Sequence, residues 1–463
     1  MASPVGGNVT ARLTLCRLPP EALTPHAGNM PKEPSSFPTP TISRVLPDGT
    51  MIELLYDADA STTALAICPP SGTPTIKSRI DLTDHESLVP YAAGNNLLTS
   101  GCVVLPSAVG DYTDKASLLA DIKAFIHSYV DLTPLFEDIA AQYVLLTWVH
   151  DAFNELPYLR FRGEFGSGKT RALLAIGSLC YKPFFASGAS TVSPIFHILH
   201  EFGGTLVLDE ADLRFSDATA DLTKILNNGN MKGLPVLRTM TNRHRELNPQ
   251  AFKVFGPKLI AMRESFADEA LESRFLTEET GGRPLRGDIS IHLPDAMKVE
   301  AQHLRNTLLA WRFANRNHVT IDPDRLIDGI SPRGNQTALA LLSLVDDPAL
   351  RDAIGTHLAM GEARAAAQRA TLPHVAMVGV LNDMFRSTPT PYLPLADVAQ
   401  QFNRHGNHTM PIKSVGHLVR TRLGIETTKS RGVYVIAKTE KGKVDALASR
   451  YGLTCDEGAT HTN

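Results

Sequence analysis

The stretch that decides the fold lies at residues 163–170 and reads Gly163-Glu164-Phe165-Gly166-Ser167-Gly168-Lys169-Thr170. It fits the pattern G-x-x-x-x-G-K-[ST], the P-loop, in which glycines let the backbone curl so that its N–H groups point at phosphate oxygens. In such a loop we expect Lys169 to bind the β- and γ-phosphates of ATP and Thr170 to ligate Mg²⁺. All eight residues are therefore candidate nucleotide-binding residues.

The sequence on either side of this octapeptide favours a strand, a loop and a helix in that order. Residues 156–161 form a short apolar run that predicts a strand, and residues 171–180 have helical spacing. A helix that begins directly after the loop turns the positive end of its dipole towards phosphate. The alternative, a glycine-rich turn before an ordinary helix, explains these flanks less well.

An acidic pair follows later in the chain. Residues 204–208 are an apolar strand that runs into Asp209 and Glu210. Charge at the end of a buried strand is costly unless a metal or a donor compensates it. We expect Asp209 to hold Mg²⁺ and Glu210 to position and polarise the attacking water. The alternative is a solvated loop after a core strand.

The next strand has an unusual end. Residues 254–262 predict this strand, whose end in many P-loop ATPases carries Asn or Thr that senses the γ-phosphate. Here Met262 stands near that place and Arg263 follows it. Either Arg263 takes the sensing role or the alignment is displaced by one residue.

Two further arginines are candidates for nucleotide contact. We expect Arg274 to reach from one subunit into the nucleotide of the next, where it would stabilise charge on the γ-phosphate. The alternative for Arg274 is a surface salt bridge with a nearby glutamate. Arg333, at the start of a helical stretch, is either a second nucleotide sensor or an ordinary helix-start arginine.

Residues 232–250 read as a strand, a basic tip and a second strand. A hairpin at this position would face the central pore of a ring. Lys232, Arg243 and Arg245 would then grip a phosphate backbone, a salt-sensitive contact with little sequence information. The alternative is a solvated basic loop.

The C-terminal region predicts a winged helix. Residues 393–402 and 413–423 read as helices, and a turn at 429–432 precedes a strand at 433–436. From residue 402 to residue 450 there are ten Lys and Arg against three Asp and Glu. The candidate phosphate contacts are Arg420, Arg422, Lys429 and Arg431. The alternative is a winged helix used only for protein contacts.

The composition of the whole chain narrows its class. With 463 residues and a net charge of −3, the chain is long enough for two to four domains and is no polycation, so basic patches must be local. Its five scattered cysteines argue against a disulfide framework. No apolar run is long enough to cross a membrane, and the N-terminus lacks the layout of a signal peptide. We therefore expect a cytoplasmic protein without a membrane partner.

Changes in pattern along the chain predict an α/β protein with several segments. They are a disordered tail (1–42), a small β-rich module with strands at 51–56, 63–68 and 101–106 (43–111), a parallel-sheet core with preceding helices (112–285), a helical lid (286–370), the winged helix (371–452) and a second tail (453–463).

Together these motifs resemble the core of AAA+ ATPases. More narrowly, they resemble helicase-like ATPases encoded near primases in phages, plasmids and integrative elements, which are similar to minichromosome-maintenance helicases. The matching stretches are 143–153, 177–183, 189–195, 205–212, 224–228 and 270–275, and Ser273-Arg274-Phe275 resembles the arginine-finger motif of that group.

The resemblance implies a hexameric ring that uses ATP and Mg²⁺ to move on single-stranded or forked DNA, with a primase as a partner. We therefore expect an ATP-dependent DNA helicase or translocase that replicates a mobile element or phage. The alternative is a non-unwinding AAA+ ATPase, a replication loader or transposition regulator, that assembles on DNA.

Overall fold

A five-stranded parallel sheet forms the centre of the protein. The computed structural model describes residues 38–83, 85–211, 217–241, 247–266, 268–282, 284–370, 372–406 and 409–453. The sheet has the order β14-β8-β13-β10-β9. Its strands are β8 (Tyr158–Arg162), β9 (Phe184–Ser187), β10 (Leu206–Asp209), β13 (Lys258–Met262) and β14 (Phe275–Glu279). The expected α/β core with a parallel sheet is confirmed.

Helices cover both faces of this sheet, as crossover connections between parallel strands require. Alternate strand residues point to opposite faces. Leu159 and Phe161 pack in one apolar cluster with α4 (Lys169–Leu179), whereas Tyr158 and Ile260 pack in a second cluster. The second cluster includes residues of α5 (Val192–Phe202) and α6 (Asp217–Asn228).

Further helices extend the first cluster. They are α2 (Lys115–Tyr129), α3 (Pro134–Val149), the 3₁₀ turn η1 (His150–Ala152), α8 (Ala296–Asn315), α9 (Pro332–Leu342) and α10 (Pro348–Ala370). The 3₁₀ turn η2 (Pro323–Arg325), between α8 and α9, has no buried residue. Because α3 is apolar around most of its circumference, it is buried between other elements. The helical character expected for residues 114–154 and for most of 286–370 is confirmed.

The N-terminal module contains two small sheets, ordered β1-β7-β6 and β2-β3-β4-β5. Its elements are β1 (Thr39–Thr41), β2 (Ser43–Val45), β3 (Met51–Asp57), β4 (Thr62–Cys68), β5 (Thr75–Lys77), β6 (Ile80–Thr83), β7 (Glu86–Pro90) and α1 (Asn96–Thr99). The strands expected at 51–56 and 63–68 are confirmed.

Two expectations for this module are wrong. The expected tail of residues 1–42 ends too late, because β1 pairs in parallel with β7; residues 1–37 of that tail lie outside the described residues. Residues 101–106 form no strand: Val103 makes only an isolated antiparallel bridge to Phe184 of the central sheet. A local pattern does not reveal such partners, which lie far away in the sequence.

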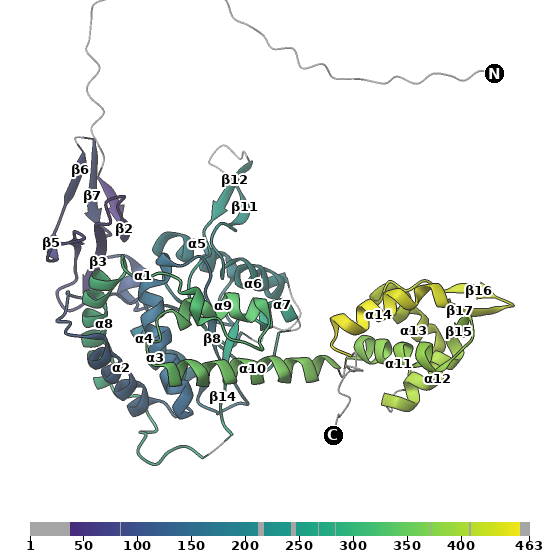
Figure 1. Cartoon of the computed structure of the whole chain (residues 1–463). Helices are drawn as coiled ribbons and strands as arrows, with labels where there is room; N and C mark the ends of the chain where they lie inside the picture. The colour runs from purple at the N-terminus through teal and green to yellow at the C-terminus, as the bar shows by residue number, and fades with distance from the viewer. Residues whose placement is uncertain are drawn as a thin grey trace, which may run out of the picture.

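An antiparallel hairpin projects from the core beside α5 and α6 (Figure 1). It consists of β11 (Val236–Thr241) and β12 (Leu247–Phe252), which confirms the expected strand pair. The short helix α7 (Glu269–Glu272) precedes β14. Among the residues that the structure describes, no helix has the length and apolar character needed to cross a membrane.

The C-terminal region forms a separate body beyond the end of α10 (Figure 1). Its elements are α11 (Pro373–Ser387), β15 (Tyr392–Pro394), α12 (Leu395–Gly406), α13 (Ile412–His417), the π-helical segment η3 (Leu418–Arg422), β16 (Thr428–Ser430), β17 (Val433–Ala437), η4 (Lys438–Glu440) and α14 (Lys441–Arg450). The three strands form an antiparallel sheet in the order β15-β17-β16, and the region has an apolar core of its own.

Candidate nucleotide and nucleic-acid sites

Residues 163–168 connect β8 to α4 in a tight curl. Gly166 and Gly168 have φ values of 78° and 88°, a left-handed backbone that favours glycine. Gly163 is needed for a different reason: a Cβ atom there would lie 2.4 Å from the carbonyl oxygen of Thr280. The glycines of the motif therefore have separate steric functions, and the loop ends at the first turn of α4.

Lys169 and Thr170 of the motif lie in one polar group with Asp209. The Lys169 Nζ atom donates to the carbonyl oxygens of Gly163 and Glu164, each at 2.7 Å, and to Ser167 Oγ at 3.3 Å. The Thr170 hydroxyl donates to Asp209 Oδ2 at 2.7 Å. The structure thus brings together the two side chains that sequence reasoning assigned to Mg²⁺.

These residues fit a magnesium–nucleotide complex. Mg²⁺ is usually bound through one or two carboxylates, phosphate oxygens and water. The Thr170 hydroxyl and the Asp209 carboxylate are oxygen ligands of this kind, next to a loop whose shape suits phosphate. In the part of the chain that the structure describes, no group of three His, Cys, Asp or Glu side chains forms a metal site. A cation held here would therefore depend on the phosphates for its remaining ligands.

Glu210 has a strained backbone. Its φ of 53° is unusual for a residue with a side chain. Its N–H donates to Asp209 Oδ1 at 2.9 Å, and Ala211 N–H donates to the Ala261 carbonyl at 3.0 Å. A Cβ atom on Gly188 would lie 2.6 Å from the Glu210 carbonyl oxygen. The chain therefore turns sharply after Asp209, against a neighbour with no side chain.

Strand β13 lies between the P-loop strand β8 and the acidic strand β10, so its end adjoins both. The Met262 side chain is buried in the second apolar cluster, and Arg160 Nη1 lies 3.8 Å from its sulfur. Met262 therefore does not present a polar group at the carboxyl edge of the sheet. Arg263, the next residue, is exposed there, so its assignment as the sensor remains a prediction.

Arg274 lies at the opposite edge of the sheet from the P-loop. Its carbonyl accepts a hydrogen bond from Tyr158 N–H, at the beginning of β8, whereas the P-loop follows the end of β8. Five residues of strand separate these edges by roughly 16 Å. Arg274 is 8% exposed, and its Nε donates to Asn230 Oδ1 at 2.9 Å. Among the described contacts Arg274 has no salt bridge with Glu272, which instead pairs with Arg160.

Arg333 lies beside Arg274 and not beside Lys169. Both guanidinium groups donate to the carbonyl oxygen of Ala270, at 2.9 Å from Arg333 and 2.8 Å from Arg274. Burial lowers the pKa of Arg274 below its usual range and the charge of Arg333 lowers it further, although Asp268 partly offsets this. The structure thus places two predicted nucleotide-contacting arginines together, away from the P-loop of the same chain.

The β11–β12 hairpin has two different faces. Val236 and Phe252 form a pair in the ladder and are buried at its base, whereas Leu237 and Leu247 on the opposite face are exposed. Arg238 turns back to the core, where its guanidinium pairs with Asp221 at 2.8 Å and lies over the Phe196 ring. The predicted DNA-contacting residues Arg243 and Arg245 lie outside the described residues.

Lys232 does not lie on the projecting part of the hairpin. Its Nζ donates to the carbonyl oxygen of Asp151 at 2.7 Å and lies 5.5 Å from the centre of the Phe255 ring. Burial lowers the pKa of Lys232 below its usual range. The structure therefore places Lys232 at the edge of a buried ionic cluster, in a position different from the one expected for a DNA-gripping tip.

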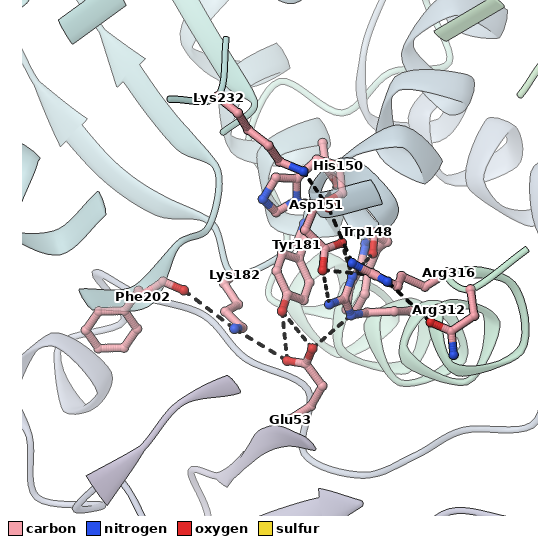
Figure 2. Close-up of polar contacts among 12 residues, drawn as sticks. Glu53, Trp148, His150, Asp151, Tyr181, Lys182, Phe202, Lys232, Arg312 and Arg316 are labelled. Atoms are coloured by element: carbon pink, nitrogen blue, oxygen red, sulfur yellow. Dashed lines mark hydrogen bonds and ion pairs between the residues drawn. The ribbon is translucent and has the colours of Figure 1, made fainter. Parts of the chain in front are cut away.

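This cluster joins four parts of the chain, as Figure 2 shows: Glu53 from β3, Asp151 from η1, Tyr181 and Lys182 after α4, and Arg312 of α8 with Arg316 directly after that helix. Arg312 Nε donates to Glu53 Oε1 at 2.8 Å, and its terminal nitrogens donate to Asp151 at 2.8 and 3.0 Å. Tyr181 OH donates to Glu53 Oε1 at 2.7 Å. The N-terminal module is thereby fastened to the end of the P-loop helix.

Burial perturbs the charged groups of this cluster strongly. It lowers the pKa of Lys182 to about 8 and the pKa of His150 to about 4. Burial alone would raise the pKa of Asp151, but Arg312 and Arg316 bring it well below its usual range. The arginines therefore hold Asp151 in its charged form, and His150 is neutral at pH 7.

In the C-terminal region, the predicted basic residues lie on two neighbouring elements. Arg420 and Arg422 belong to the π-helical segment η3 and are exposed. Lys429 is exposed on β16, and Arg431 is in the turn between β16 and β17. The helix order and the three-stranded antiparallel sheet are compatible with a winged helix, which stays a prediction.

Sequence reasoning missed the residue that braces the P-loop from the side. Thr280, which follows β14, exchanges a hydrogen bond with Ser167 Oγ at 2.8 Å and donates to the Arg162 carbonyl at 3.1 Å. No motif marks Thr280, because its position depends on the pairing of β14 with β8. No motif marks Gly188 either, although the absence of a side chain there leaves room for Glu210.

Comparison with known proteins adds only weak similarities. No protein-family model matches this chain, and no curated protein matches it. Among solved structures, the apo C-terminal region of NrS-1 covers 83% of this chain and 96% of its own, with 10% identity and a TM-score of 0.37. The active helicase Cch of SCCmec type IV covers 87% and 97%, with 13% identity and a TM-score of 0.34.

The JCV helicase, bound to a small molecule, covers 55% of this chain and 62% of its own, with 16% identity and a TM-score of 0.24. Two of these three structures are thus helicases by name. At such low identities and TM-scores, the similarities do not assign the chain to a family. The candidate nucleotide site therefore rests on the geometry of this chain. A glycine-rich loop, a lysine and a threonine–aspartate pair meet at the carboxyl edge of a parallel sheet, where such sheets bind ligands.

Proposed function

We propose that this chain is an ATP-dependent DNA helicase or translocase with an AAA+ core. The observation that carries the proposal is the 2.7 Å hydrogen bond from the Thr170 hydroxyl to Asp209 Oδ2. It lies beside the glycine-rich loop, where Lys169 Nζ donates to the Gly163 carbonyl oxygen. Strand β13 between β8 and β10 supports an AAA+ core, in which the P-loop strand and the acidic strand are not neighbours.

Within this proposal, each residue at the carboxyl edge has a distinct task. Lys169 neutralises charge on the β- and γ-phosphates, and Thr170 and Asp209 hold Mg²⁺, which when bound supplies further positive charge to the phosphates. Glu210 orients and polarises the attacking water. The glycines at 166 and 168 let backbone N–H groups approach the phosphate oxygens.

We further propose that Arg274 and Arg333 act on the nucleotide of a neighbouring subunit in a ring, most simply a hexamer. Both lie at the sheet edge opposite their own P-loop, so neither can serve the site of its own chain without large rearrangement. Two guanidinium groups that share one carbonyl oxygen repel each other. An anionic phosphate delivered by a second subunit would relieve that repulsion.

DNA is the proposed track of this motor. The hairpin β11–β12 projects from the core, and Arg420, Arg422, Lys429 and Arg431 form an exposed basic surface on the C-terminal domain. Basic side chains of this kind bind phosphates with little sequence preference. Lys232 is not part of this proposed contact, because its ammonium group is held inside the protein.

A strand-displacement experiment tests the proposal. We expect the wild-type protein to release a labelled strand from a forked duplex when ATP and Mg²⁺ are present. Lys169→Ala should abolish both ATP turnover and displacement, whereas Lys298→Ala, a change at an exposed surface lysine, should preserve both. If ATP is hydrolysed on DNA and no strand is released, the protein is instead a non-unwinding ATPase that assembles on DNA.

A further inference from the structure

The β16–β17 hairpin of the C-terminal domain has a tightly defined geometry. Ser430 and Val433 face each other in the ladder, so Arg431 and Gly432 alone make the turn. Their φ values are 48° and 88°. Positive φ at both central residues is typical of the two-residue turn whose twist matches that of paired strands. The direction of each side chain on β17 therefore follows from the pairing.

Tyr434 lies on the face of this hairpin that adjoins the helices. Tyr434 and Ile436 are two residues apart on β17, so their side chains point to the same face, and Ile436 is completely buried in the domain core. The partner of Tyr434 across the ladder is Lys429, which shares that face. Yet Tyr434 is 54% exposed, because it extends past the core towards the tip. An exposed aromatic ring thus stands next to a basic residue.

Arg420 supports this ring from the neighbouring helix. Its guanidinium carbon lies 5.9 Å from the centre of the Tyr434 ring, and its Nη1 donates to Thr427 Oγ1 at 3.0 Å. A Cβ atom on Gly416 would lie only 3.2 and 3.3 Å from the two terminal nitrogens of Arg420. The hydrogen bond to Thr427 therefore keeps the guanidinium beside the ring, in a place that a side chain at position 416 would crowd, and Arg420 is less able to extend to a phosphate than its exposure alone indicates.

The surroundings of this pair attract an anionic polymer with aromatic groups. Lys429 and Arg431 are exposed on the hairpin, and among the ion pairs of the described residues none involves Arg420, Lys429 or Arg431. Nucleobases stack on aromatic rings and on guanidinium planes, but a base inside a duplex already has both faces covered by its neighbours. Only an unpaired base can use such a platform.

We propose that Tyr434, supported by Arg420, stacks an unpaired base at the point where a duplex opens, while Lys429 and Arg431 hold the adjoining phosphates. The C-terminal domain then prefers forked DNA to blunt duplex DNA. This inference rests on the proposed function of the domain in DNA binding, and it adds a base-stacking residue to the phosphate contacts.

Binding of the full-length protein to labelled DNA tests the inference. A forked DNA and a blunt duplex with the same paired sequence are titrated by fluorescence anisotropy without ATP. Tyr434→Ala should weaken binding to the fork about tenfold and binding to the blunt duplex less than about twofold. Tyr434→Phe keeps the ring and should behave as wild type. A 2-aminopurine at the first unpaired position should be quenched by wild type and by Tyr434→Phe, but not by Tyr434→Ala.

A second variant separates this inference from the proposed function. The double change Lys429→Ala with Arg431→Ala should weaken binding to both DNAs alike and reduce the salt dependence of log K by about 2. If that double variant acts as expected but Tyr434→Ala affects both DNAs equally or neither, the stacking inference is wrong and DNA binding stands. If neither variant changes binding to either DNA, the domain does not bind DNA and both proposals for it fail.

Discussion

At the scale of single residues, Glu210 combines a catalytic assignment with a strained backbone. Its left-handed φ of 53° follows directly after Asp209, whose carboxylate accepts both the Thr170 hydroxyl and the Glu210 N–H. Strain of this kind persists only where the surroundings hold it. Here Gly188 leaves room for the turn. In the proposed site, this turn would let the two consecutive carboxylates serve different tasks.

We predict that Glu210→Gln lowers the rate of ATP hydrolysis by at least about 100-fold and leaves ATP affinity nearly unchanged. The amide keeps the size of the side chain but cannot polarise water as a carboxylate does. Hydrolysis is measured by phosphate release and affinity with a fluorescent ATP analogue. Glu201→Gln, on the exposed end of α5, is the matched control. A Glu210→Gln variant with normal turnover would remove Glu210 from the catalytic site.

His150 makes the stability of the protein sensitive to acid. Its pKa is lowered from 6.5 to about 4 by burial, so between these values the folded state binds fewer protons than the unfolded state. The neutral, buried His150 therefore contributes to the free energy of unfolding in full above pH 6.5. This contribution is lost as the pH falls towards 4, a difference of about 3 kcal/mol.

We therefore predict that urea unfolding midpoints fall more steeply from pH 7 to pH 4.5 in wild type than in His150→Asn. The asparagine can still donate to the Thr147 carbonyl, which His150 Nδ1 contacts at 2.7 Å, but it does not titrate. Carboxylates elsewhere titrate in both proteins, so the difference in slope isolates His150. Equal slopes would show that His150 is not responsible.

At the scale of elements, the ionic cluster links β3 of the N-terminal module to α8 and to the end of the P-loop helix (Figure 2). Glu53 and Arg312 are both almost completely buried. Removing one partner of a buried ion pair leaves the other charge uncompensated, which is more costly than the pair is favourable.

We predict that Glu53→Ala lowers the free energy of unfolding by about 3–5 kcal/mol. Glu86→Ala is the matched control, because Glu86 forms an ion pair with Arg44 whose side chains are both more than 40% exposed; its loss should cost at most about 1 kcal/mol. Urea unfolding followed by circular dichroism measures both. Similar losses for the two variants would mean that the cluster does not fasten the module.

The sequence predicted most elements but not their partners. The P-loop flanks, the acidic strand, the β11–β12 hairpin and the C-terminal helices all follow from local periodicity and turn residues. The prediction that Lys232 lies at the tip of the hairpin was wrong. Its contacts, Asp151 and Phe255, are both more than twenty residues away in the sequence, so no local pattern reveals them. Strand β1 was missed for the same reason, since its partner β7 comes much later in the chain.

At the scale of the whole molecule, the sheet separates the two halves of the proposed active site. The P-loop and Asp209 lie at the carboxyl edge, and Arg274 with Arg333 lies at the amino edge. A complete site then needs two chains that meet edge to edge. In a closed ring every chain contributes one half to each of two sites.

We predict that Lys169→Ala and Arg274→Ala are each inactive as ATPases, and that a mixture of the two regains activity. A site with an intact P-loop and an intact arginine forms where an Arg274→Ala chain meets a Lys169→Ala chain in the right order. Random mixing at equal amounts gives up to about a quarter of such sites. Phosphate release is followed after mixing. No recovery, in mixtures shown by light scattering to form rings, would contradict action in trans.

The sequence by itself determined the local chemistry of this protein. A glycine-rich octapeptide, an acidic pair after an apolar strand and a basic C-terminal region are patterns of neighbouring residues, and their meaning depends on spacing along the chain. Only the tertiary structure decided which of these patterns meet. It inserted β13 between β8 and β10, joined Thr170 to Asp209, set Arg274 at the far edge of the sheet and supported Tyr434 with Arg420. Strand order and burial arise from contacts between distant segments, which no local pattern specifies.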